Sequence, residues 1–372
     1  MKVFVIKAAV LFMRILYSVL KLRPQKKRIV MLSRECDSPP VDFLLLENEI
    51  KRQLPDYEVV MLCKFLSSSS IDIFGTAKNT LQSMLLLSTA SACILDTYSL
   101  PASVLNHRKG FAVIQIWHAL GGLKESGYSA LGKKGGHSPK VAEAICLHKN
   151  YSLVCAASES ARELYSRAFG CDKGIIEKLG MPRIDYILSQ SEMKSERTAE
   201  IIKNHPELAN GKKNILYAPT FRADSSPDIE KMFSIIDTSK YNLAVKAHIV
   251  SGGGELPAGV ITLNETIFDL FEISDYIITD YSAASVEGAL TCKPLFFYVY
   301  DIDEFESERG LFIDPLKCYP SISSKRFEDI YSIIENGGYD YAALEAFKNR
   351  TVECADTHSS ERIIARLREM LQ

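Results

Sequence analysis

Apolar residues along this chain fall into short runs that alternate with polar, helix-like stretches. A run of four to six aliphatic or aromatic residues predicts a buried strand, and apolar positions three or four apart predict an amphipathic helix. Strands are expected at residues 28–33, 58–63, 92–96, 112–117 and 151–156, and helices at 41–54, 79–89 and 159–169. This alternation predicts a parallel sheet with helices packed on its faces.

The alternation is interrupted once and then starts again. The stretch Gly180-Met181-Pro182-Arg183-Ile184-Asp185 breaks the pattern, and a polar helix is expected at 191–204. Further strands are expected at 214–217, 242–246, 260–263, 276–279 and 294–298. Two successive βα domains predict a ligand cleft between them, at the carboxyl ends of the strands.

The expected domains follow from this break, and the length of 372 residues suits two of them. Residues 28–188 are expected to form a first Rossmann-like domain and residues 189–345 a second. Residues 346–372 are expected to form helices that pack near the hinge.

The first 27 residues are apolar and basic. Lys7, Arg14 and Lys21 recur every seven residues, so a helix places them near one face. This favours a helix lying in the membrane interface, with Lys26-Lys27-Arg28 on anionic headgroups at the cytoplasmic side. A membrane-spanning helix and a helix packed on the protein are the alternatives. A secretory signal peptide is disfavoured because Arg14 splits the apolar region.

The charge balance hides an asymmetry. Of the 44 basic residues, nine precede the first acidic residue, Glu35, which leaves 35 basic against 46 acidic residues and about 11 net negative charges in the rest. Such a body does not suit a general nucleic-acid binder. The nine cysteines are scattered without a C-x-x-C pair, a pattern typical of reduced thiols in a cytosolic compartment.

Several strand ends carry residues able to do chemistry. His118 follows the strand at 112–117, where side chains face a ligand cleft and an imidazole can accept a hydroxyl proton; a core histidine bonded to a carbonyl is the alternative. Lys246 and His248 lie at the end of the strand expected at 242–246. Two cationic donors at one strand end suit a diphosphate. Arg222 follows residues 214–217, and its guanidinium suits phosphate oxygens, although most single arginines are surface residues.

A polar cluster follows the strand at 276–279. Asp280 and Ser282 are expected to cap a helix through Val286, Gly288 and Leu290, whose N-terminus would present unpaired N–H groups to an anion. An ordinary capped strand-to-helix junction is the alternative. No convincing D-x-D loop and no ligand-like Cys and His spacing occurs, so neither a metal nor another cofactor is expected.

These motifs together resemble the CDP-glycerol glycerophosphotransferase family of teichoic acid synthesis over roughly residues 110–315. The resemblance rests on Trp117-His118, Gly180-x-Pro182-Arg183-x-Asp185, Tyr217-Ala218-Pro219-Thr220-Phe221-Arg222, Lys246-x-His248, Ile278-Thr279-Asp280-Tyr281-Ser282, and Lys293-Pro294 through Asp301 to Arg309-Gly310. It implies an α/β GT-B fold and a peripheral membrane enzyme acting on lipid-linked acceptors. The chain departs from the usual Trp-His-Gly-Thr at Ala119-Leu120, which affects the acceptor and subclass more than the chemistry.

The resemblance also assigns residues. It makes His118 and His248 the two catalytic-site histidines, with His118 as the base and their roles exchangeable. The residues implied in holding the CDP donor are Arg222, Lys246, Thr279, Asp280, Ser282, Ala283 and, near the ribose, Glu287. Four further residues have less defined roles: Lys124, Arg183, Asp301 and Arg309.

The implied reaction is transfer of glycerol phosphate from CDP-glycerol to a hydroxyl of a prenyl-diphosphate-linked glycan, with release of CMP. The alternatives are a ribitol phosphate transferase using CDP-ribitol, a GT-B nucleotide-sugar glycosyltransferase, and a non-catalytic membrane-bound scaffold. The expected partners include anionic membrane lipid and exclude nucleic acid.

Overall fold

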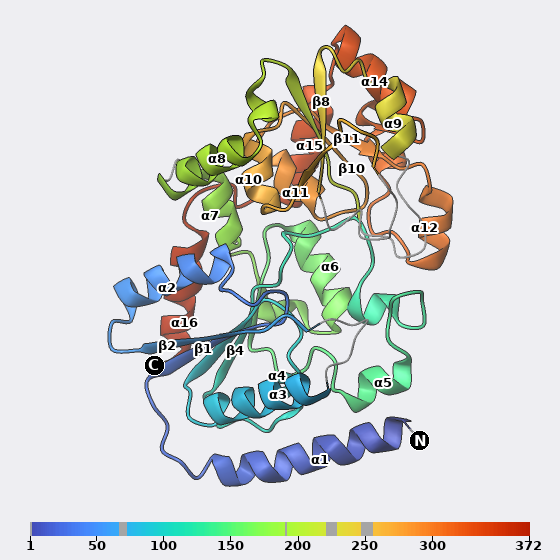
Figure 1. Ribbon diagram of the computed structural model, residues 1–372. Helices are drawn as coiled ribbons and strands as arrows, with labels where there is room; N and C mark the ends of the chain where they lie inside the picture. The colour runs from blue at the N-terminus through green and yellow to red at the C-terminus, as the bar shows by residue number, and fades with distance from the viewer. Residues whose placement is uncertain (1, 67–72, 190–191, 221–228, 247–255) are drawn as a thin grey trace. The chain divides into compact units, whose positions relative to one another are not determined.

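The computed structural model of the protein describes residues 2–66, 73–189, 192–220, 229–246 and 256–372 (Figure 1). It divides into two compact units. Unit 1 comprises Met1–Leu120, Glu125–Tyr186 and Glu353–Gln372, and unit 2 comprises Gly121–Lys124 and Ile187–Val352. The predicted α/β fold with two parallel sheets is confirmed.

Unit 1 contains a six-stranded sheet of order β2-β1-β3-β4-β5-β6, parallel throughout. Its strands are β1 (Arg28–Ser33), β2 (Glu58–Cys63), β3 (Ala92–Leu95), β4 (Ala112–Gln115), β5 (Leu153–Cys155) and β6 (Ile176–Glu177). Strand β4 ends two residues before the predicted position, because Trp117 has a φ of 60° that no regular strand accommodates. The two-residue β6 is too short to leave an apolar pattern in the sequence.

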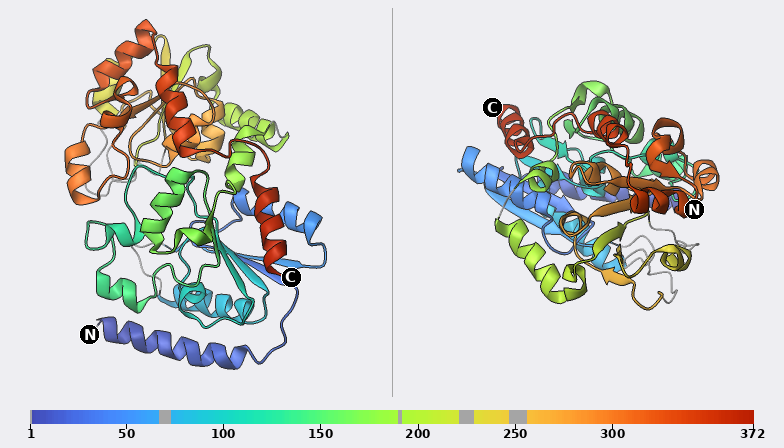
Figure 2. Two further views of the ribbon diagram at one scale, coloured as in Figure 1. Left: turned by 180° about the vertical axis from the view of Figure 1, so that it is seen from behind. Right: turned by 90° about the horizontal axis from the view of Figure 1, so that it is seen from above.

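Helices cover both faces of this sheet (Figures 1 and 2). On one face α2 (Val41–Gln53) and α16 (Ser359–Met370) pack side by side, and Phe43, Ile50 and Ile364 meet Ile29 and Ile94 of the strands. On the other lie α3 (Ile73–Leu87) and α4 (Leu100–Val104). The remaining helical elements of unit 1 are η1 (Gly127–Ala130), α5 (Pro139–Ala144), α6 (Glu159–Phe169), η2 (Lys173–Ile175) and the start of α7 (Pro182–Leu188).

The stretch that breaks the sequence pattern fastens the C-terminal helix to unit 1. Both Asp185 carboxylate oxygens accept backbone N–H groups at the start of α16, from Ser359 at 2.8 Å and Ser360 at 2.7 Å. Gly180 has a φ of +78°, and a Cβ there would lie 2.3 Å from the Ser359 hydroxyl. Residues 353–372 therefore complete the first unit, because α16 fills its core.

Helix α1 (Lys2–Leu20) lies beside α3 and α5, with its charged face turned to unit 1. Lys7 pairs with Glu143, and Arg14 donates to the Val104 carbonyl at 2.8 Å. The opposite face exposes large apolar side chains: Phe4, Val5, Leu11, Phe12, Ile15 and Val19. By length and composition, Val3–Leu20 is also apolar enough to cross a bilayer. The predicted single cationic face exists, but the protein itself occupies it.

Unit 2 contains a second parallel six-stranded sheet, of order β12-β11-β10-β7-β8-β9. Its strands are β7 (Lys213–Tyr217), β8 (Tyr241–Lys246), β9 (Ile261–Leu263), β10 (Tyr276–Thr279), β11 (Leu295–Tyr298) and β12 (Ser323–Ser324). Helices α9 (Ile229–Ile235) and α14 (Phe327–Asn336) pack on one face, where Met232 and Phe327 meet Tyr217 and Phe296. The other helical elements are α8 (Glu192–Asn204), η3 (Pro206–Ala209), α10 (Ile267–Glu272), α11 (Ala284–Ala289), α12 (Ile302–Glu308), α13 (Pro315–Cys318), η5 (Pro320–Ile322) and α15 (Tyr341–Thr351).

Each sheet has a point where the strand order reverses. In unit 1 it lies between β1 and β3, and in unit 2 between β7 and β10. Open α/β sheets bind ligands at the carboxyl ends of strands beside such a switch point. His118 follows β4, the neighbour of β3, and Thr279 ends β10, with Asp280 directly after it. The fold thus gives each unit one edge suited to a ligand.

Candidate active site

His118 stands exposed just beyond the carboxyl end of β4. Its Nδ1 lies 3.1 Å from the carbonyl oxygen of Asp96, the residue that follows β3. A carbonyl can only accept, so in the neutral ring Nδ1 carries the proton and Nε2 has the lone pair. The Trp117 ring packs against the imidazole, with centroids 4.3 Å apart. The contact with Asp96 thus favours the tautomer in which Nε2 is the basic nitrogen.

Arg183 holds the backbone of His118 in place. Its Nη1 donates to the His118 carbonyl at 2.6 Å, while Nη2 donates to Asp42 at 2.8 Å. Its backbone N–H also donates to Asp42, at 2.9 Å, and both side chains are buried. Arg183 therefore acts in this structure as a link between α7, α2 and the His118 peptide, and its guanidinium is not exposed to a ligand.

Asp96 itself is buried beside this histidine. Its side chain is 3% exposed, and burial raises the pKa of the carboxyl to about 7 although a hydrogen bond from Ser33 opposes the shift. Nearby Cys36 raises it further. Neither Asp96 nor Asp42 was selected from the sequence; the signal for Asp96 was its place at the end of a strand next to the one that leads to His118.

In unit 2 the Thr279 and Asp280 side chains are fully buried and brace a neighbouring loop. Asp280 Oδ1 accepts from the Thr220 N–H at 2.7 Å, from its hydroxyl at 2.9 Å and from the Ser282 N–H at 3.0 Å. The Thr279 hydroxyl donates to the Ala218 carbonyl at 2.8 Å. Both residues thus fasten the segment after β7 to the end of β10, at the switch point of the sheet.

The helix predicted after this turn is short. It runs from Ala284 to Ala289, one residue short of Leu290, and its N-cap is Ala283 without a side-chain cap, so the prediction of Asp280 or Ser282 as the cap is wrong. The Ser282 hydroxyl accepts the Ala284 N–H, whereas the Ala283 N–H has no acceptor within the described part of the chain. Glu287 lies in α11 and is 3% exposed. Of this cluster, Ser282 and Ala283 are the partly exposed members.

Lys246, at the end of β8, is turned toward backbone carbonyls. Its Nζ donates to the Asn264 oxygen at 2.7 Å and to the Glu265 oxygen at 2.5 Å. Burial lowers the pKa of this ammonium, with an opposing effect from Glu265. The side chain closes the turn after β9. Two other predicted site residues, Arg222 and His248, lie outside the described residues.

Asp301 and Arg309 flank α12, close to the same β10 turn. The buried Tyr281 donates its hydroxyl to Asp301 at 3.2 Å, and its ring stacks on Phe305 with centroids 4.0 Å apart. The Arg309 guanidinium lies over the same Phe305 ring, 5.8 Å from its centroid. Lys124 forms a backbone bridge with Leu311, two residues beyond Arg309. The structure therefore groups Tyr281, Asp301, Arg309 and Lys124 within unit 2.

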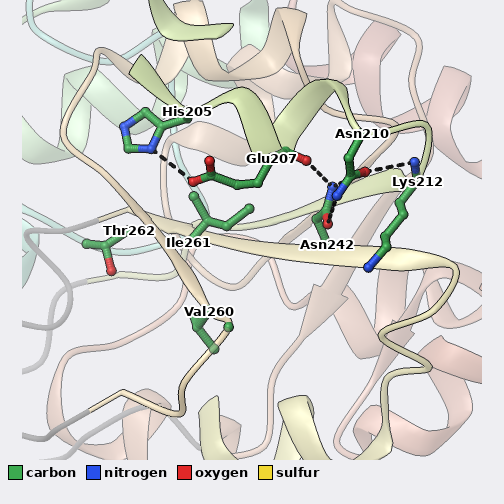
Figure 3. A pocket seen from close by; sticks show the side chains of 9 residues that line it. His205, Glu207, Asn210, Lys212, Asn242, Val260, Ile261 and Thr262 are labelled. Atoms are coloured by element: carbon green, nitrogen blue, oxygen red, sulfur yellow. Dashed lines mark hydrogen bonds and ion pairs between the residues drawn. The ribbon is translucent and has the colours of Figure 1, made fainter. Parts of the chain in front are cut away.

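A surface pocket of about 480 Å³ lies elsewhere, at the amino ends of the unit 2 strands (Figure 3). The two asparagine side chains that line it are hydrogen-bonded within the protein. Asn210 Nδ2 donates to Asn242 Oδ1 at 3.2 Å, and Asn242 Nδ2 donates to the backbone carbonyl of Glu207 at 3.0 Å. The pocket is at the edge opposite the switch-point loops, because Asn242 is the second residue of β8. Within the described ranges, no group of three or more His, Cys, Asp or Glu side chains suits a metal ion.

Comparison with known proteins gives consistent relatives. The chain is 28% identical over 356 residues to the teichoic acid ribitol-phosphate primase of Bacillus spizizenii, covering 91% of this chain and 90% of the relative. It is 28% identical over 294 residues to the teichoic acid glycerol-phosphate primase of Bacillus subtilis, covering 76% and 75%. A teichoic acid poly(ribitol-phosphate) polymerase of Bacillus spizizenii is 27% identical over 94% of this chain, which spans only 57% of that polymerase.

Solved structures agree on the fold. A variant of the wall teichoic acid polymerase TagF superposes with a TM-score of 0.75 at 19% identity, covering 96% of this chain and 93% of the other. This likeness shows a GT-B-like architecture. In sequence, residues 15–369 match the family described as CDP-Glycerol:Poly(glycerophosphate) glycerophosphotransferase. The match spans nearly the whole chain, and the protein therefore belongs to this family of transferases.

Proposed function

We propose that this protein transfers glycerol phosphate from CDP-glycerol to a hydroxyl of a membrane lipid-linked glycan, releasing CMP, in the synthesis of teichoic acid or a related surface polymer. Family membership and the glycerol-phosphate primase of Bacillus subtilis support the reaction class. A TagF structure after a soak with CDPG supports the donor class. The observation that carries the proposal is the exposed His118, whose Nδ1 is occupied by the Asp96 carbonyl.

In the proposed reaction His118 is the general base. The acceptor oxygen attacks the phosphorus that bears the glycerol, and its proton passes to His118 Nε2. A new phosphorus–oxygen bond forms, and the bond from this phosphorus to the bridging oxygen breaks, so that CMP leaves with that oxygen. A positioned base of this kind contributes about 10²–10⁴-fold to the rate.

Unit 2 is proposed to hold the CDP donor. His248 and Arg222 supply charge to the diphosphate in this proposal, together with the Ala283 N–H and Arg309. Arg309 suits this role because its guanidinium lies over the Phe305 ring and makes no ion pair or hydrogen bond among the described residues. Asp280 contributes indirectly, since it fixes Thr220, two residues before Arg222.

Transfer of ribitol phosphate from CDP-ribitol is the second candidate. The observation that favours it is the relative itself: the ribitol-phosphate primase of Bacillus spizizenii matches at the same 28% identity as the glycerol-phosphate primase and over more of the chain. The two donors differ only in the polyol, so a direct competition between them decides.

Peripheral attachment at the cytoplasmic face of the membrane is proposed to occur through α1. Phe12 and Phe4 are 66% and 76% exposed, on the face opposite the contacts of Arg14 with unit 1. A helix that crossed the bilayer would lose the ion pair of Lys7 and the hydrogen bond of Arg14, whereas one lying in the interface keeps both.

The deciding experiment measures CMP release by the full-length protein from CDP-glycerol and from CDP-ribitol, with and without a prenyl-diphosphate disaccharide. UDP release from UDP-glucose is measured in parallel. We expect acceptor-dependent CMP release that His118→Ala lowers by about 10²–10⁴-fold. His358→Ala is the matched control, since His358 is exposed in the same unit and its ring pairs with Glu361. Release of UDP but not CMP would establish a sugar transferase instead, and silence with every donor would favour a scaffold.

A further inference from the structure

Trp117 adopts a backbone conformation that a bulky residue rarely takes. Its φ is 60°, in the left-handed region, and it lies between the end of β4 and His118. Such a conformation is strained and persists only when neighbouring contacts hold it. The direction in which His118 leaves the sheet depends on this residue, so whatever holds Trp117 also sets the position of the imidazole.

The carboxamide of Gln115 supplies that contact. Gln115 is the last residue of β4 and is completely buried. Its Oε1 accepts the Trp117 N–H at 2.8 Å, and its Nε2 donates to the Thr97 carbonyl at 3.0 Å and to the Tyr151 hydroxyl at 3.0 Å. Both N–H donors and the acceptor of the amide are therefore in use.

These bonds reach both sides of the His118 contact. Trp117 directly precedes His118, and Thr97 directly follows Asp96, whose carbonyl oxygen meets the imidazole Nδ1. One buried amide thus joins the turn after β3 to the turn after β4. Movement of either turn changes the distance between His118 and the carbonyl that fixes its tautomer.

Aromatic packing supports the same geometry from the other side. The Trp117 ring contacts Phe169 at 4.9 Å between centroids and His148 at 5.7 Å. His148 Nδ1 lies 2.8 Å from the Tyr151 hydroxyl, which is also the partner of Gln115. Burial lowers the pKa of His148 to about 3, so this ring stays neutral beside His118 at physiological pH.

We propose that Gln115 is a positioning residue for His118: it holds the strained Trp117 peptide and the turn after β3 so that Nδ1 meets the Asp96 carbonyl and Nε2 accepts the substrate proton. The inference rests on the proposed role of His118 as base. It assigns to Gln115 no contact with substrate. A sequence-based search overlooks such a residue, because a glutamine inside an apolar strand shows no recognisable motif.

The test uses Gln115→Met, which keeps the volume and removes all three hydrogen bonds. The matched control is Asn214→Leu, which removes another buried amide that also bridges carbonyls, those of Leu208 and Ile273 in unit 2. The first readout is nitrogen NMR of labelled histidine, with the His118 signals assigned by their loss in His118→Gln. It reports the tautomer and pKa of His118 without any reaction.

We expect Gln115→Met to shift the His118 signals toward a mixture of tautomers and to lower kcat for CMP release about 10²-fold, with KM for CDP-glycerol unchanged. Asn214→Leu should change neither the tautomer nor kcat. Gln115→Glu should recover activity relative to wild type as the pH falls, because a protonated buried carboxyl can accept from Trp117 and donate one hydrogen bond.

Unchanged His118 signals in Gln115→Met, or an equal change in Asn214→Leu, would overturn the inference. If Gln115→Met does not fold, Tyr151→Phe removes one of the three bonds and should give a smaller shift of the same kind; no shift would equally overturn it. A wild-type rate in His118→Ala, together with altered His118 signals in Gln115→Met, would refute the role of the base while leaving the positioning intact.

Discussion

The two sheets are both parallel and six-stranded, but their carboxyl edges use polar side chains in opposite ways. At the unit 1 edge His118, the proposed base, is exposed, and the groups that hold it are buried or belong to the backbone. At the unit 2 edge Thr279 and Asp280, selected from the sequence as ligand-binding, are themselves buried and hold a loop. A polar residue at a strand end can therefore have one of two roles. An exposed side chain can contact a ligand, whereas a buried one is a brace, a side chain whose hydrogen bonds hold a neighbouring segment in place.

The difference has an energetic reason. A buried carboxylate is tolerated only when hydrogen bonds replace its lost hydration, and Asp280 collects three on one oxygen. Those bonds leave that oxygen little capacity for a ligand. An exposed imidazole needs no such compensation, and the bond from Nδ1 to the Asp96 carbonyl makes Nε2 the basic nitrogen of the neutral ring.

The largest effect is expected from His118→Ala. The variant should lose about 10²–10⁴-fold in acceptor-dependent CMP release, because it lacks the base. Its melting temperature should stay near that of wild type, since the side chain is exposed. Steady-state kinetics and calorimetry measure the two effects. A large loss of stability would show that the His118 side chain also holds the structure together, and the contrast between the two units would disappear.

Arg183→Met should cost mainly stability. The buried guanidinium pairs with Asp42, so its removal leaves an uncompensated buried carboxylate at a cost of about 3–5 kcal/mol. Denaturant unfolding measures the loss. The double variant Asp42→Asn with Arg183→Met should be more stable than the sum of the single changes predicts. Additive losses would mean that the two side chains act independently.

Asp96→Asn should change how stability depends on pH. The folded pKa of Asp96, about 7, lies above the ordinary value of 3.8, so the folded state holds the proton more tightly. The contribution of the protonated Asp96 carboxyl to the free energy of unfolding is fully present below about pH 4. It falls as the pH rises to about 7, by at most about 4 kcal/mol. Asp96→Asn should remove this slope from urea unfolding measured between pH 4 and 8. An unchanged slope would assign the dependence to another group.

Asp280→Ala should destabilise unit 2 and weaken donor binding together. Three donors from Thr220 and Ser282 lose their acceptor, at a cost of about 1–3 kcal/mol. The KM for CDP-glycerol should rise more than kcat falls, because Thr220, two residues before the proposed donor-binding Arg222, loses its hydrogen bonds to Asp280. Asp303→Ala is the control: Asp303 is an exposed partner of Lys325, and its removal should change stability by less than about 0.5 kcal/mol. Equal effects of the two variants would argue against the role of Asp280 in holding the segment after β7.

The smallest effect is expected at α1. Phe12→Ser should weaken binding to anionic vesicles by roughly tenfold, which corresponds to about 1.5 kcal/mol, the low end of the range for burying one Phe side chain. Folding should be unaffected because Phe12 is exposed. Tyr341→Ser, at an exposed aromatic residue of unit 2, should leave vesicle sedimentation unchanged. Equal binding of Phe12→Ser and wild type would refute attachment through this face.

Much of the architecture was predictable from local pattern. Strands β1, β2 and β10 and helix α6 begin and end where the spacing of apolar residues placed them. The two-residue β6 and β12 were not predicted, because a pair of residues has no period. Helix α7 was missed as well, since Pro182 was interpreted only as a break although proline is favoured in the first helical turn.

The candidate site was predictable in part. The position of His118 after a buried strand was visible, but its supports, Asp42, Asp96 and Gln115, come from elements far apart in the chain. The face that α1 turns outward was not visible either. Seven-residue spacing predicted one cationic face but could not say that Arg14 would bond to Val104 and leave the apolar face exposed.

The sequence by itself determined the class of fold, the two-part order of the elements and the residue types able to do chemistry, because these depend on local periodicity and on side-chain identity. Only the tertiary structure decided which polar groups remain exposed and which are buried and hold neighbouring segments by hydrogen bonds. That outcome depends on burial and on hydrogen-bond partners contributed by distant segments, and neither is a property of the local sequence.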